Sequence, residues 1–75
     1  MKAFVLVIAE SEAVKQVRKT LGDVKGCTIY ATEGLFDLII SVETEKKESV
    51  SELVRDIRMI PGVKSTLTLM GAPGA

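Results

Sequence analysis

The sequence contains no histidine, the residue that most often serves proteins as a general base or metal ligand. Its single cysteine, Cys27, can form neither an intrachain disulfide nor a zinc-binding cluster. No apolar run reaches the roughly 18 residues of a transmembrane helix, and the glycines form no phosphate-binding loop. Basic and acidic residues balance at 10 each, which argues against a nucleic-acid-binding surface. We therefore predict a non-enzymatic protein with no catalytic residue, no metal or other cofactor, and no direct contact with nucleic acid or membrane.

The chain is short and apolar for its size. Its 75 residues suit one domain, and a domain this small buries only about 60% of its unfolded surface. Hydrophobic residues nevertheless make up 47% of the chain, and the mean hydropathy is +0.29. Oligomerisation would cover apolar surface that one small core cannot. The apolar residues 4–9 are too short for a secretion signal and lead into Glu10 and Glu12, so we predict a cytoplasmic homo-oligomer.

An apolar run in the middle of the chain, residues 33–43, contains two unexpected residues. Leu38 and the residues after it are apolar on both sides of a strand, so both faces of that strand must be covered. Asp37 interrupts this run, and an unpaired buried carboxylate costs on the order of several kcal/mol. Gly34 indicates a sharp turn or a close approach of the backbone. Asp37 therefore either lies at the solvated end of the strand or binds something.

The rest of the chain divides into regular elements by its hydrophobic period. Residues 3–9 form a continuous apolar run typical of a central strand. An amphipathic helix follows, capped by Ser11 and ended by Gly22. A second helix, predicted over residues 45–60, has Thr44 or Ser49 as its cap and ends at Pro61-Gly62. The remaining predicted segments are a strand within 24–32, a strand over 63–70 with Val63, Ser65, Leu67 and Leu69 on one side, and a flexible tail at 71–75.

This order of elements predicts an α+β, ferredoxin-like βαββαβ domain over residues 1–70. Its antiparallel sheet has the order 4-1-3-2. This order makes the first and third strands central, and these are the two strands that are apolar on both faces. Right-handed crossovers place both helices on one face and leave the other face bare. Either Phe4, Leu6 and Ile8 or the alternating set of Val5, Val7 and Ala9 lies on the bare face. We expect sheet-to-sheet dimerisation there, as in a dimeric α/β barrel.

Two halves of the sequence carry motifs of one known family. They are Gly34-x-Phe36-Asp37-Leu38-x-x-x-Val42 and Ile60-Pro61-Gly62-Val63-x-x-Thr66-x-Thr68. In order and spacing they resemble the effector-binding (RAM) domain of the leucine-responsive Lrp/AsnC regulators. The resemblance covers nearly the whole chain and is to the stand-alone form, without a DNA-binding helix-turn-helix. Glu33 and Leu35 depart from the family pattern, which commonly has Thr and a polar residue there.

The resemblance implies an amino-acid-sensing module in transcription regulation. Such modules dimerise through their sheets, and the dimers often form rings of about eight or ten subunits. A small amino-acid effector binds in clefts between dimers, near the hairpin entrance, and a full-length Lrp/AsnC regulator is an implied partner. The implied ligand-binding residues are Glu33, Gly34, Phe36, Asp37, Thr66 and Thr68.

Each of these residues also has a structural interpretation. Asp37 either pairs with the ammonium group of an amino acid or accepts backbone N–H groups at the hairpin. Glu33 either serves the same ligand group or is an exposed turn carboxylate, and Gly34 either admits a ligand or supplies a positive φ. Phe36 either walls a pocket or packs in a core or interface. The two threonines either offer hydroxyls to a carboxylate or point outward from an edge strand.

Other functions compete with amino-acid sensing. The main alternative is an interaction module that assembles without an effector. A small cofactor-free oxygenase with the same dimeric barrel is a further class, although the sequence has only two Phe and one Tyr and no His. A small-molecule module of the ACT kind is another, and direct DNA binding is the least favoured.

Overall fold

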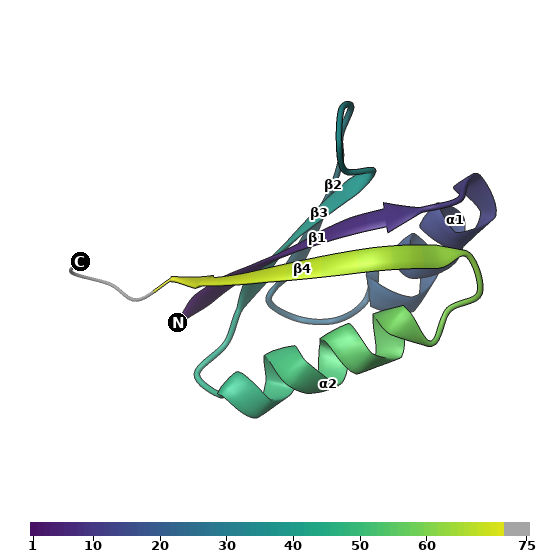
Figure 1. Cartoon of the computed structure of the whole chain (residues 1–75). Coiled ribbons are helices and arrows are strands. Elements are labelled where there is room, and N and C mark those ends of the chain that lie inside the picture. The colour runs from purple at the N-terminus through teal and green to yellow at the C-terminus, as the bar shows by residue number, and fades with distance from the viewer. Residues whose placement is uncertain (72–75) are drawn as a thin grey trace.

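The structure, a computed structural model, describes residues 1–71. The elements follow the chain as β1 (Lys2–Ala9), α1 (Ser11–Leu21), β2 (Cys27–Ala31), β3 (Leu38–Glu43), α2 (Lys47–Arg58) and β4 (Val63–Gly71). The four strands form one antiparallel sheet with the order β2-β3-β1-β4. Both helices lie against the same face of this sheet, and the opposite face carries no helix (Figure 1). The predicted ferredoxin-like fold and strand order are therefore confirmed.

The hydrophobic core lies between the sheet and the two helices. Alternate residues of β1 and β3 point into it, as the period of two requires for strands with one face against helices. Each helix contributes one apolar stripe at helical spacing. No polar or charged residue is buried among residues 1–71. The largest fully buried side chains are Leu38, Ile40, Ile57, Val5, Val7 and Val17.

The helix-free face, which we call the open face, carries the other half of the strand residues. Of the two alternatives for β1, the structure selects Phe4, Leu6 and Ile8, because Val5 and Val7 are fully buried under the helices. The strand register brings Phe4 beside Leu69 and Leu6 beside both Leu67 and Ile39. An apolar surface therefore runs across the open face from β4 to β3.

The prediction that four alternate residues of β4 share one side is wrong at its first residue. The pairing of β1 with β4 shifts between Ile8 and Ala9, so that Ala9 pairs with Val63 whereas Ile8 pairs with Ser65. This irregularity turns Val63 toward the core, where it packs on the helix side. Leu67 and Leu69 lie on the open face.

Element ends differ from the predicted ones by a few residues. Glu10, not Ser11, is the N-cap of α1, since its carbonyl accepts the N–H of Val14 at 3.0 Å. Neither Thr44 nor Ser49 caps α2, whose N-cap is Lys46; the Thr44 hydroxyl instead accepts the Lys46 N–H at 3.2 Å in the preceding turn.

The last strand also ends later than predicted. Gly71 belongs to β4, one residue beyond the predicted end at residue 70, and residues 72–75 of the predicted tail lie outside the described residues.

Neither helix within residues 1–71 has the length and hydrophobicity to cross a bilayer.

Candidate functional site

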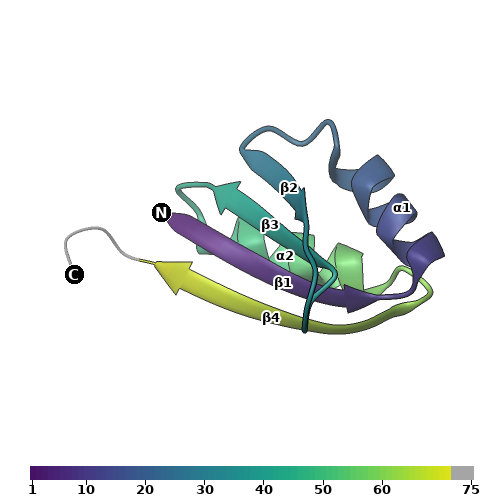
Figure 2. The same cartoon turned by 90° about the horizontal axis from the view of Figure 1, so that it is seen from above.

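The hairpin loop, residues 32–37, joins β2 to β3 and rises from the open face, away from both helices (Figures 1 and 2). Gly34 has φ +114°, and a Cβ at this position would meet nothing within 4 Å. This glycine therefore serves the turn and makes no close contact inside the subunit. Leu35, beside it, is 86% exposed. The loop above the open face thus carries a large, exposed apolar side chain.

Asp37 fastens this loop to the central strand β1. Its backbone N–H donates to the carbonyl of Val7 at 2.8 Å, and its Oδ2 accepts the N–H of Ala9 at 2.8 Å. Because β3 begins only at Leu38, no β3 backbone group is in place to take the Ala9 N–H. The carboxylate therefore replaces a missing rung of the ladder, and the structural interpretation of Asp37 accounts for its position.

The other hairpin residues also serve the loop itself. The Thr32 hydroxyl donates to the Phe36 carbonyl at 2.6 Å, and the Thr32 N–H donates to the Asp37 carbonyl at 3.0 Å. Phe36 is half-buried, and Glu33 is exposed. Of the predicted ligand residues in this loop, Glu33 thus keeps its side chain free for solvent or a partner.

The two predicted threonines lie on the other side of the sheet. Thr66 pairs with Val7 and Thr68 with Val5, both of which face the helices. The tip of the hairpin loop, in contrast, lies above the open face (Figure 2). Within one subunit the structure therefore does not gather the two halves of the predicted site around a single cavity.

Sequence reasoning predicted a bare apolar sheet face but did not place the leucines of β4 on it. Leu67 is 48% exposed, Leu69 50%, Phe4 37% and Tyr30 53%. The pairing of Tyr30 with Ile39 continues the apolar surface toward β2. We call Phe4, Leu6, Ile39, Leu67 and Leu69 the open-face patch. The sequence signal for this patch was the alternation of leucine with threonine in β4. This alternation places the leucines on one side of the strand, but it does not show which side the helices cover.

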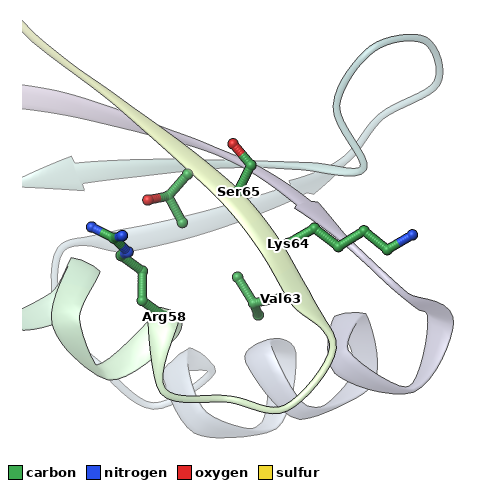
Figure 3. Close-up of a pocket in the computed structure, with 5 residues that line it drawn as sticks. Arg58, Val63, Lys64 and Ser65 are labelled. Atoms are coloured by element: carbon green, nitrogen blue, oxygen red, sulfur yellow. The ribbon is translucent and has the colours of Figure 1, made fainter.

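A groove between α2 and the edge strand β4 holds two surface cavities. The first, of about 310 Å³, is lined by Arg58, Val63, Lys64, Ser65 and Thr66. Figure 3 shows Arg58 rising from the end of α2 beside β4, while Lys64 points away from it. The second cavity, of about 380 Å³, is more apolar and is lined by Val50, Ser51, Val54, Thr68 and Met70. The predicted threonines thus belong to this groove.

The remaining chemistry-bearing side chain is Cys27 on β2. It is a free thiol, half-buried, and burial raises its pKa above the ordinary value. A raised pKa lowers the thiolate fraction, which is the nucleophilic form. Within residues 1–71, no three Asp, Glu or Cys side chains come together in a geometry for metal binding.

The family model for "NapD protein" matches residues 4–70, which is nearly all of the described chain. This chain belongs to the NapD family. No protein of curated function matches it.

Solved structures share its fold. The TTHA0845 protein of Thermus thermophilus has a TM-score of 0.83 at 24% identity, over 99% of this chain and 95% of that one. The Tat proofreading chaperone protein NapD of E. coli has a TM-score of 0.72 at 22% identity, over 96% and 77%. AsnC of E. coli has 0.72 at 23%, over 96% of this chain and 52% of AsnC. The predicted likeness to the Lrp/AsnC module is therefore confirmed for the fold, whereas the matching family is NapD.

Proposed function

We propose that this NapD-family chain is a non-enzymatic interaction module that binds an apolar segment of a partner protein on the open face. The observation that carries the proposal is the open-face patch. A single domain of this size normally covers such a surface, because contiguous exposed apolar area is unfavourable in water. Here Leu67 and Leu69 are half exposed, while the alternating Thr66 and Thr68 take the helix side.

The family supports a particular kind of segment. The E. coli relative is described as a Tat proofreading chaperone, and Tat cargo carries a twin-arginine address. Signal segments of this type have basic residues followed by an apolar stretch of about 7–15 residues. As a helix that stretch is about 10–22 Å long, and the eight residues of β1 span about 26 Å. The open face therefore has the length to hold it.

The hairpin loop supplies the polar end of this site. Glu33 is exposed on the loop, above the open face, and is suited to pair with the basic residues of the segment. Leu35, 86% exposed beside it, would pack on the apolar stretch. On this proposal the module acts in the cytoplasm, where the free Cys27 stays reduced.

A second copy of the chain is the competing occupant of the open face. Sheet-to-sheet dimerisation would bury the same patch, so a dimer of this kind and the partner complex exclude one another. The predicted rings of such dimers are part of this alternative, and they would need contacts between dimers in addition to the open face.

Amino-acid sensing is the second candidate function. Two observations favour it: the likeness in fold to AsnC and the groove that holds Thr66 and Thr68 between α2 and β4. The ligand role predicted for Asp37 stays a prediction: its Oδ2 accepts the Ala9 N–H, and its other oxygen remains as an acceptor. A shift in assembly size or thermal stability with a pool of the twenty amino acids is the expected sign of sensing, with a full-length Lrp/AsnC regulator as its reader.

The test of the main proposal uses a synthetic peptide with two arginines followed by a leucine- and alanine-rich stretch of twelve residues. Calorimetry should detect binding to the wild type and at least a tenfold loss in Leu69→Lys. Val24→Lys is the matched control, since Val24 is a similarly exposed apolar residue, at 41%, outside the open face. Equal binding by both variants would overturn the proposal. Light scattering on a sizing column, with and without the peptide, tells whether the peptide displaces a dimer.

A further inference from the structure

The two edges of the sheet are unequal. At one edge, β2 has five residues, whereas at the other β4 has nine. Long exposed edges present unpaired backbone groups and are usually shortened, charged or covered, because another strand can pair with them. The middle of β4, from Ser65 to Met70, contains no charged residue and no proline. This edge therefore keeps the properties of a surface that accepts a strand.

The free backbone groups of β4 can be assigned from the ladder. The Thr44 N–H donates to the Met1 carbonyl at 3.0 Å, so the odd-numbered residues of β1 direct their backbone groups toward β3. Even-numbered residues of β1 therefore bond to β4, through the partners of Phe4 and Leu6. By the same alternation, the N–H and C=O groups of Thr66, Thr68 and Met70 point to the free edge.

Side chains beside this edge form two unlike binding features. The apolar cavity lies at the Thr68 and Met70 end of β4 and faces Val54 of α2. The polar cavity lies at the Thr66 end and is lined by Arg58. Met70 is four positions after Thr66 in the strand, which is about 13 Å. A strand laid along the edge would thus place two of its own side chains, four positions apart and on one face, over the two cavities.

The charge at this edge selects the occupant. No acidic side chain lines either cavity, and Arg58 makes no ion pair within residues 1–71. An acidic side chain is therefore the complement at the Thr66 end, where the Thr66 hydroxyl is also available. A second copy of β4 would not supply it, because Val63–Gly71 contains no Asp or Glu.

We propose that the β4 edge is a second docking surface, separate from the open face, which adds an extended segment of a partner protein as a fifth strand. The segment carries an apolar residue over the apolar cavity at Met70 and an acidic residue, four positions away, beside Thr66 and Arg58. Backbone bonds to Thr66, Thr68 and Met70 give the affinity, and the two side chains give the selectivity. The open face and this edge would bind different segments, and each can fail independently of the other.

Two fluorescein-labelled heptapeptides test the proposal, Thr-Leu-Thr-Val-Thr-Glu-Thr and its reverse, which cover both strand directions. Anisotropy should detect binding of one of them, and amide hydrogen exchange should slow at Thr66, Thr68 and Met70. The amides of Leu67 and Leu69 should not change, because they already bond to β1. Thr68→Pro should abolish binding with the fold retained, since proline removes only an outward N–H.

A second experiment tests the role of charge by comparing the glutamate-containing peptide that binds with an analogue in which glutamine replaces the glutamate. Arg58→Gln should weaken the Glu peptide about two- to fivefold, the range of an exposed ion pair, and leave the Gln peptide unchanged. Arg18→Gln is the matched control, since Arg18 occupies the last turn of α1 as Arg58 does in α2. Protection at every β4 amide, changes confined to the open-face patch, or no binding by either peptide at millimolar concentration would each overturn the proposal. Slow exchange at the β4 edge in a peptide-free dimer would also overturn it, by showing that a second copy is the occupant.

Discussion

Replacement of Asp37 by alanine should destabilise the fold itself rather than remove a ligand. The Asp37 carboxylate accepts the N–H of Ala9 at 2.8 Å in a partly buried position. Ala9 is only 9% exposed, so water does not readily replace this acceptor. Asp37→Ala therefore leaves a buried donor without a partner and removes one of the two bonds that fasten the hairpin loop to β1.

The size of the loss follows from the type of bond. A hydrogen bond to a charged group contributes about 1.5–3 kcal/mol, and we expect the free energy of unfolding to fall by that amount. For a domain of this length the corresponding drop in Tm is roughly 6–24 °C. Asp37→Asn keeps an acceptor oxygen but loses the charge, so its cost should be about half as large.

Urea unfolding followed by circular dichroism measures this difference, with amide hydrogen exchange at Ala9 as the local readout. The Ala9 amide should exchange faster in Asp37→Ala than in the wild type. Asp23→Ala is the control, because Asp23 lies exposed in the turn after α1 and should change stability by no more than about 0.5 kcal/mol. If Asp37→Ala stayed within that same range and Ala9 remained protected, the structural role of the carboxylate would be refuted.

The remaining predictions concern two glycines, Ile57 and Cys27. Gly26→Ala should lower the free energy of unfolding more than Gly34→Ala does, and paired urea titrations compare the two variants. Both glycines have positive φ, but a Cβ at Gly26 would lie 2.5 Å from the Glu43 carbonyl oxygen, whereas a Cβ at Gly34 would meet nothing within 4 Å. Ile57→Ala should cost about 2–5 kcal/mol, since Ile57 is fully buried, and a loss below about 1 kcal/mol in calorimetry would contradict its place in the core. The Cys27 thiol should react with iodoacetamide more slowly than a free thiol until the chain unfolds. Since burial raises its pKa in the folded state, the unfolded chain releases the proton first, and stability should fall as pH rises past the ordinary thiol pKa, an effect that Cys27→Ser removes.

The sequence alone determined the elements and their order. The apolar runs of β1 and β3, the helical stripes, and Gly22 and Pro61-Gly62 are local signals, and a four-stranded sheet with two helices on one face is what right-handed connections allow. The same patterns predicted an apolar face without a helix. These properties depend on the hydrophobic period and on chain connectivity, and both can be recognised from residues that are close together in the sequence.

The motif around Asp37 led to a family of the right fold, but it could not show what the carboxylate bonds to. That partner, the Ala9 N–H, lies 28 positions away in the sequence. Its availability depends on where β3 begins, and therefore on how β1 and β3 are aligned.

Only the tertiary structure decided which side of each strand faces the helices. Alternation divides the residues of a strand between two sides, but it does not show which side faces the helices. In addition, the register shift at Ile8 and Ala9 places Val63 on the opposite side of β4 from Leu67. The shift results from pairing between strands far apart in the chain, so it has no local signal. It places the leucines of β4 on the open face and the threonines beside α2, and both proposed docking surfaces depend on that choice.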